Sequence, residues 1–156
     1  IEEGEENKKE VIGLVFDSMS ELEAYVLKVM DSCAEICAEE MLEIMENEIN
    51  SQVYNGYSPN MYVRTMELLR TPTKISADRS GMHTRFEDNG GWYSLRGSAK
   101  GQHFFPFYGL EEDLHSTGGT WGRGSTDVIG QSDELCKMNI PMKYKEAMRA
   151  FGIPIV

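Results

Sequence analysis

Apolar side chains recur every three or four positions between residues 22 and 50. They are Leu22, Val26, Met30, Cys33, Cys37, Met41 and Ile44, and Glu35, Glu39, Glu43 and Glu46 mark the opposite side. This period is typical of an amphipathic helix. Ser20 and Glu23 have the spacing of a capping box, so the pattern predicts a helix from about Ser20 to Asn50. A helix of roughly thirty residues is long for a small domain, and we expect it to lie across a sheet or to reach a neighbouring subunit.

Short alternating segments in the middle of the chain predict strands. Residues 73–77 and 82–86 alternate polar and apolar side chains around the turn 78–81, which indicates a β-hairpin. A further turn at 89–91 precedes a predicted strand at 92–95. Near the start, the apolar run 11–16 is short enough for a strand or for an arm that docks on a neighbour.

Two further helices are predicted. Ser58 and Pro59 are typical of an N-cap and a first helical position, and we expect a short helix from Asn60 to Leu69. Apolar residues at helical spacing predict a C-terminal helix from Pro141 to Phe151, which Gly152 and Pro154 would end. The sequence therefore predicts an α+β fold, in which a long N-terminal helix packs on a small antiparallel sheet. We divide the chain into an arm, 1–17, and one domain, 18–156.

The segment 97–130 is rich in Gly, Ser and Thr and is interrupted by aromatic residues, which predicts a long loop. Loops of this length inside a compact domain usually have a function. We expect both this loop and the arm to become ordered against neighbouring chains. The candidate inter-subunit contacts are Phe104, Phe105, Phe107, Tyr108, Trp121 and Arg123.

The charge is distributed unevenly. Residues 1–50 hold fifteen Asp and Glu against three Lys, whereas residues 51–156 hold eleven acidic and twelve basic residues. The acidic first third is unsuited to bind a phosphate backbone. It is either a solvated helix face, or a surface that contacts a basic partner or repels DNA as the wall of a channel. No apolar run is long enough to span a bilayer, and we expect a protein made in the cytoplasm without a membrane partner.

No set of residues predicts catalysis, a cofactor or a metal. Three cysteines do not form a disulfide framework, and Cys33 and Cys37 lie four apart on the apolar side of the predicted helix, where burial is expected. The three histidines are scattered. The run Gly118–Gly124 resembles a phosphate loop but lacks the Lys-Ser/Thr that such a loop requires.

One segment stands apart from this background. Residues 54–69 read Y-x-x-Y-x-P-x-x-Y-x-R-T-x-x-L-L, and the motif consists of Tyr54, Tyr57, Pro59, Tyr62, Arg64, Thr65, Leu68 and Leu69. Turn signals and large aromatics without a reactive group predict a packed elbow between elements, with its tyrosines at least half buried and Arg64 paired with an acid. The motif, closing a long helix, resembles the pattern in neck, head–tail joining and tail-completion proteins of tailed bacteriophages, including the HK97-type tail-completion family.

The resemblance implies a mixed α/β subunit that assembles as a homo-oligomeric ring around the DNA and tail axis. Its implied partners are other neck, tail or portal-complex proteins, with DNA close by in the channel, and its implied location is the virion. The alternative is a small ligand-binding or hydrolytic domain that uses the aromatic and glycine-rich segment 103–124 as its site.

Overall fold

The computed structural model describes residues 14–55, 66–87, 92–93, 103–104 and 126–155. The elements in chain order are α1 (Met19–Ile49), a π-helix (Asn50–Tyr54), a 3-10 helix (Glu67–Arg70), β1 (Pro72–Asp78), β2 (Gly81–Phe86), β3 (Trp92–Tyr93), β4 (His103–Phe104) and α3 (Val128–Ala150). This arrangement confirms the predicted α+β class.

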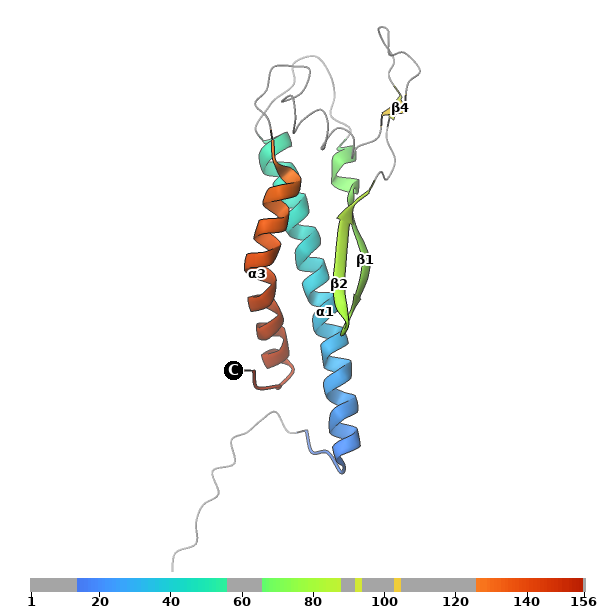
Figure 1. The fold of residues 1–156 in the computed structure, drawn as a ribbon, viewed down its shortest axis with the longest axis vertical. Helices are drawn as coiled ribbons and strands as arrows, with labels where there is room; N and C mark the ends of the chain where they lie inside the picture. Colours follow the sequence, from blue (N-terminus) through green and yellow to red (C-terminus); the bar gives the residue numbers. More distant parts are fainter. Residues whose placement is uncertain (1–13, 56–65, 88–91, 94–102, 105–125, 156) are drawn as a thin grey trace, which may run out of the picture.

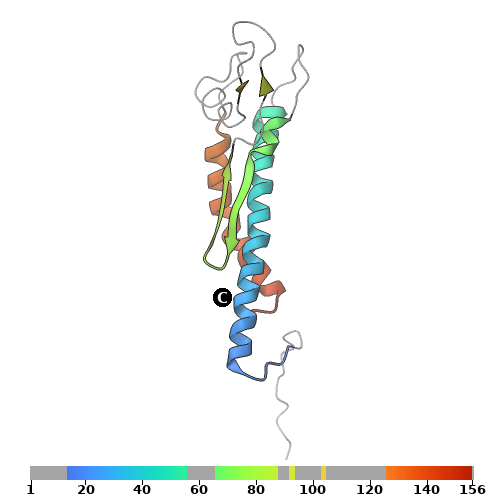
Figure 2. The ribbon, with the colours of Figure 1, turned by 90° about the vertical axis from the view of Figure 1, so that its right-hand side faces the viewer.

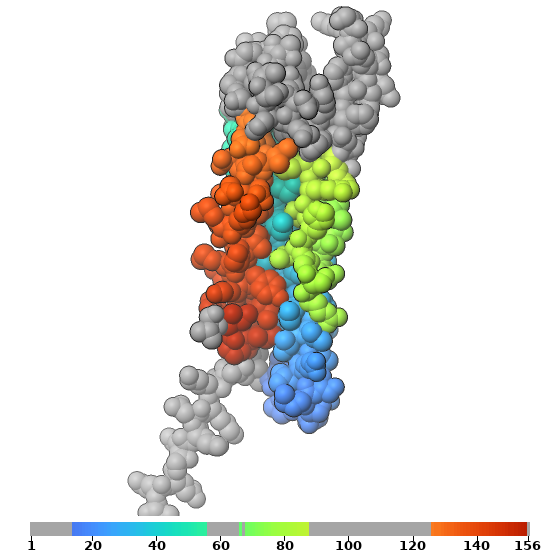
Figure 3. All heavy atoms as spheres, in the orientation of Figure 1, coloured from blue at the N-terminus to red at the C-terminus, as the bar shows by residue number. Residues whose placement is uncertain are grey.

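Helix α1 is the central element of the described structure. It packs against α3 on one side and against the β1–β2 hairpin on another, and all three run side by side (Figures 1 and 2). Its 31 residues span about 46 Å at 1.5 Å per residue. The N-terminal turns of α1 extend beyond both α3 and the hairpin (Figure 3). The long helix therefore lies along a sheet, as predicted, and also projects past it.

The predicted helix start is wrong by two residues. Ser18, rather than Ser20, is the N-cap, and its hydroxyl accepts a hydrogen bond from the backbone N–H of Glu21 at 3.2 Å. The Glu21 carboxylate in turn accepts from the N–H of Asp17 at 3.0 Å. The cap thus forms two residues earlier than predicted, because residues 18 and 21 repeat the Ser-x-x-Glu spacing that residues 20 and 23 also have. It differs from a standard capping box, because Glu21 bonds to the residue before the N-cap and not to the N-cap itself.

The hairpin is confirmed, with each strand longer than predicted at one or both ends. β1 and β2 pair antiparallel from Pro72 opposite Phe86 to Asp78 opposite Gly81. The register shifts at Ile75, a β-bulge that leaves this side chain 43 % exposed, so the predicted alternation is interrupted in β1. In β2 the alternation holds, with Met82, Thr84 and Phe86 partly buried.

Two other predictions in the middle of the chain require correction. Met66 has a left-handed conformation, φ 59° and ψ 23°, so no α-helix continues through it. From there on the 3-10 helix Glu67–Arg70 stands in place of the predicted helix 60–69. Residues 60–65 lie outside the described part. The strand predicted at 92–95 is present as β3, over its first two residues. β3 pairs antiparallel with β4, which places His103 and Phe104 in a strand within the predicted loop.

Helix α3 begins thirteen positions before the predicted start at Pro141, which instead lies inside it. Asp127 is its N-cap and accepts a hydrogen bond from the N–H of Gly130 at 3.1 Å. The predicted end is confirmed. The N–H groups of Gly152 and Ile153 donate to the carbonyls of Arg149 and Met148, and Gly152 has φ 80°, which together form a Schellman motif.

The described core has two apolar clusters along α1. The lower cluster joins α1 to α3 and to residues 153–155; its buried members are Val29, Cys33, Ala147 and Met148. The upper cluster joins the end of α1 to the 3-10 helix, the hairpin and the start of α3; its buried members are Ile49, Val53, Leu68 and Val128. Because α1 contributes to both clusters, its apolar face is what holds the other elements together.

Candidate interaction surfaces

The end of α1 forms a junction of four elements. The π-helix extends α1 by one turn and places Val53 in the upper cluster, 3 % exposed. Next to it, the side-chain amide of Gln52 accepts a hydrogen bond from the N–H of Asp127 at 2.8 Å, and the Gln52 Nε2 donates to Glu48 at 2.6 Å. The π-helix thus places Gln52 where its side chain connects the end of α1 to the N-cap of α3.

The structure describes the two ends of the predicted elbow motif. Tyr54 and Leu69 are partly buried and pack against the upper cluster, of which Leu68 is a buried member. The other motif residues, Tyr57, Pro59, Tyr62, Arg64 and Thr65, lie outside the described residues, so their burial and pairing stay predictions.

The predicted aromatic contact residues are described even less completely. The backbone of Phe104 lies in β4, paired with Trp92. Phe105, Phe107, Tyr108, Trp121 and Arg123 lie outside the described residues. The predicted contacts of these side chains therefore stay predictions, as does the predicted ordering of 1–17 and 97–125 by neighbours. The end of the predicted loop is corrected, because residues 128–130 already belong to α3 in the single chain.

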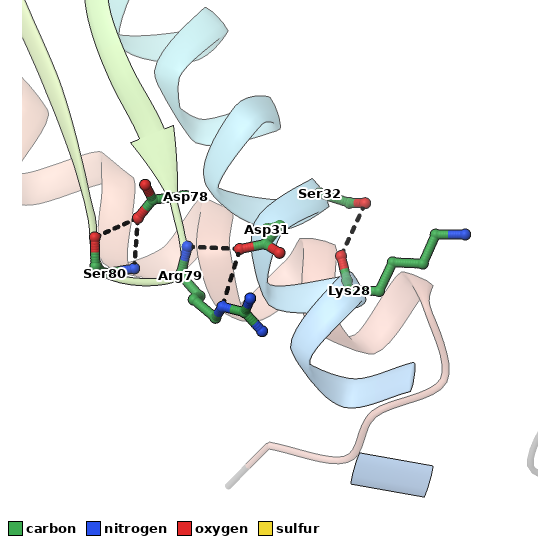
Figure 4. Close-up of polar contacts among 6 residues, drawn as sticks. All are labelled: Lys28, Asp31, Ser32, Asp78, Arg79 and Ser80. Atoms are coloured by element: carbon green, nitrogen blue, oxygen red, sulfur yellow. Dashed lines mark hydrogen bonds and ion pairs between the residues drawn. The ribbon is translucent and has the colours of Figure 1, made fainter. Parts of the chain in front are cut away.

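The hairpin is attached to α1 by ion pairs as well as by apolar contacts. At its tip, one carboxylate oxygen of Asp31 accepts a hydrogen bond from the Arg79 N–H at 2.9 Å and lies 3.6 Å from Arg79 Nε (Figure 4). Further up, Lys74 Nζ lies 2.5 Å from Glu35 and 3.3 Å from Glu39. The hydrogen bonds that Lys74 donates to these two carboxylates raise its pKa. Basic hairpin side chains thus neutralise part of the acidic α1 surface.

Another acidic residue of α1 is neutralised by α3. Lys143 Nζ lies 2.7 Å from Glu40, and this hydrogen bond raises the pKa of Lys143. By contrast, the carboxylates of Glu43 and Glu46 make no ion pair within the described residues. The acidic surface of α1 therefore has two parts. Some of its carboxylates form intramolecular ion pairs, and Glu43 and Glu46 form the part that we call the uncompensated stripe.

The uncompensated stripe borders a groove of about 530 Å³. Six residues of α1 and one of α3 line it: Ile36, Glu39, Glu40, Leu42, Glu43, Glu46 and Lys143. Ile36 is 38 % exposed, so the groove offers apolar surface between carboxylates. The sequence reasoning missed it, although Ile36 and Leu42 are apolar residues placed off the periodic buried face, which is the signal that could have indicated it.

A second exposed surface lies on α3. Met138 and Met142, one helical turn apart, are 68 % and 66 % exposed. Lys145 follows on the same side of the helix and makes no ion pair within the described part of the chain. Single exposed apolar residues are common on protein surfaces. This face is distinguished because two exposed methionines lie next to each other and next to Lys145.

A third exposed surface is the N-terminal end of α1. Leu14, Val15 and Met19 are exposed there. Beside them the ring of Phe16 lies 5.2 Å from that of Tyr25, whose hydroxyl donates to the carbonyl of Phe151 at 2.9 Å. The apolar run 11–16, predicted as a strand or as an arm that docks on a neighbour, is described from Leu14 onward. Its described part has no strand structure, and Leu14 and Val15 are exposed.

The thiols have the properties of packed side chains. Cys33 and Cys37 are completely buried, as predicted, and burial raises the pKa of both. Cys136 is partly buried, which also raises its pKa. Because the thiolate is the nucleophile, these shifts disfavour thiol chemistry. Within the described residues, no three His, Cys, Asp or Glu side chains are grouped closely enough to hold a metal ion.

No helix in the described part of the chain is both long and apolar enough to cross a membrane.

Residues 18–89 match the model of the YomN family, from the N-cap of α1 to just beyond β2. This family is phage-derived, and the match indicates a phage protein but not specifically a neck or tail-completion protein. Neither the curated proteins nor the solved structures gave a match.

Proposed function

We propose that this protein is a structural subunit of a tailed-phage particle. It forms a homo-oligomeric ring at the neck, as a head–tail connector or tail-completion component, and it has no catalytic role. It is made in the host cytoplasm and enters the virion, where its partners are other neck, tail or portal-complex proteins.

The observation that carries this proposal is the phage-family match over α1 and the hairpin. This is the part of the chain in which an acidic helix carries a docked hairpin and still leaves charged and apolar surface open. Subunits of a ring need two different exposed surfaces, because identical chains that meet head-to-tail use one surface as donor and another as acceptor. The α1 groove, the outer face of α3 and the N-terminal end of α1 are candidates for these surfaces.

The excess of acidic residues in the first third of the chain also fits a position near DNA. Carboxylates repel a phosphate backbone, so a channel wall with this charge would let DNA pass without binding it. The same charges are unsuited to a nucleic-acid-binding module, which requires a basic surface.

The experiment is mass spectrometry of purified phage particles together with native mass spectrometry of the isolated protein. We expect the chain to be present in the particle at a stoichiometry of several copies and to form a homo-oligomer in solution. A stable monomer that is absent from particles would contradict the proposal and favour a ligand-binding or hydrolytic domain built on 103–124.

A further inference from the structure

The uncompensated part of the α1 surface has both apolar and acidic character. Ile36 and Leu42 line the groove together with Glu43 and Glu46, whose carboxylates have no ion-pair partner within the described residues. Uncompensated carboxylates next to partly exposed apolar side chains favour an occupant with an apolar centre and a basic flank. The groove is therefore more specific than an acidic patch alone.

The outer face of α3 has the complementary character. Met138 and Met142 are two-thirds exposed and one turn apart, and Lys145 lies beside them with no acidic partner in the described chain. Methionine side chains are flexible and polarizable, and they adapt to irregular apolar grooves. A lysine placed next to them would bring its ammonium group to the carboxylates that border the groove.

These two surfaces cannot meet within one chain. The pairs that hold α3 to α1 use other residues, Lys143 with Glu40, and the buried face of α3 turns Ala147 and Met148 toward α1. Met138 and Met142 stay exposed with α3 docked in this way. An apolar and basic face on one copy and an apolar and acidic groove on another can pair only between molecules.

We propose that the outer face of α3, formed by Met138, Met142 and Lys145, docks into the α1 groove of a second copy of this chain. The occupant of the groove is thus another copy of the same protein, and Lys145 of that copy faces Glu43 and Glu46 of the first. The two surfaces differ, so the contact is heterologous and continues from copy to copy, which closes a ring if the rotation between neighbours allows it. The inference rests on the proposed homo-oligomer and adds the surfaces through which it forms.

Charge exchange in the full-length protein tests this contact. Lys145→Glu and Glu43→Lys should each weaken self-association on the order of tenfold or more, because each places like charges opposite one another. The double variant restores the opposite signs and should recover association. Lys28→Glu, an exposed lysine on α1 away from the groove, makes the same charge change as a matched control. Sedimentation velocity over a concentration series measures association, and circular dichroism verifies that each variant is folded.

Zero-length cross-linking gives an independent readout. A carbodiimide joins a lysine to a carboxylate only when they touch, and a mixture of isotopically light and heavy protein identifies links between copies. We expect inter-copy links from Lys145 to Glu43 or Glu46. An oligomer whose association is unchanged in both single variants and that lacks these links would overturn this interface while leaving the ring itself standing. A monomeric protein at every concentration would overturn both.

Discussion

Gln52 and Asp127 are 75 positions apart in the sequence, yet the side-chain amide of Gln52 contacts both the backbone N–H and the backbone carbonyl of Asp127. Gln52 Oε1 accepts from the Asp127 N–H at 2.8 Å, and Gln52 Nε2 lies 3.5 Å from the Asp127 carbonyl oxygen. Asp127 is the N-cap of α3, and Gln52 lies in the π-helix. One side chain thus fixes the position at which the last helix starts relative to the end of the first.

Replacement of Gln52 by Ala should lower the free energy of unfolding by about 1–2 kcal/mol, because a partly buried backbone N–H loses its acceptor. Urea denaturation followed by circular dichroism measures the loss. Gln131→Ala is the matched control, since Gln131 is exposed on α3, and we expect it to change stability much less. Equal stability of the two variants would show that water replaces the Gln52 amide without cost.

The sequence predicts the long helix and the hairpin well because both have strong periodic patterns. Cys33, Cys37 and Ile44 fall on the buried side of α1 as their spacing requires. The cap moves from Ser20 to Ser18 because local spacing alone does not decide between two similar serines. The bulge at Ile75 is not predictable from alternation, since it depends on the register against β2.

The start of α3 at Val128 could not be predicted from local sequence signals. Glycine and serine in its first turns reduce helix propensity, and Pro141 is typical of a helix start. In the structure the exposed Pro141 lies within the helix, and Val128, Ser132 and Ile140 are buried at intervals of four or eight. Tertiary packing on α1 overrides the weak propensity. The exposed Met138–Met142 face follows from that packing, so it was not predictable, whereas the off-face positions of Ile36 and Leu42 in the sequence could have indicated the groove on α1.

The three thiols should differ in reactivity. Cys136 is partly exposed, whereas Cys33 and Cys37 are completely buried between α1 and its neighbours. Under native conditions a thiol reagent such as Ellman's should therefore modify Cys136 first, and the other two only after unfolding. Reaction should be slow even at Cys136, because burial and the nearby Asp133 raise its pKa. Cys136→Ser should abolish the native-state phase; three equally fast phases in the native protein would contradict the packing of α1.

The hairpin turn should be sensitive to acid. The Asp78 carboxylate accepts hydrogen bonds from the Ser80 hydroxyl and from the Ser80 N–H, the latter at 2.7 Å, and these bonds lower its pKa. A carboxyl group with a lowered folded-state pKa stabilises the fold above its unfolded pKa, and that contribution is lost as the pH falls through the folded value. The loss is therefore expected below about pH 4.

Comparison with Asp78→Asn isolates this contribution, because Asn keeps a side-chain oxygen as acceptor but does not titrate. The stability difference between the two proteins should be present near neutral pH and should shrink as the pH falls below about 4. Urea denaturation midpoints of both proteins, measured near neutral pH and below about pH 4, give this difference. A difference that stays constant with pH would show that the ionised form of Asp78 has no advantage in the turn.

Gly152 should be the most sensitive position at the end of α3. Its φ of 80° is a left-handed conformation that costs other residues roughly 1–2 kcal/mol, so Gly152→Ala should destabilise the protein by about that amount. The effect reaches further than the turn, because Ile153 and Ile155 follow it and pack on the lower cluster. Gly152→Asn is the matched variant, since Asn tolerates this conformation, and it should lose less stability. Thermal and urea unfolding of both variants measure the order, and an alanine variant as stable as the unmodified protein would mean that residues 152–155 contribute nothing to holding α3 against α1.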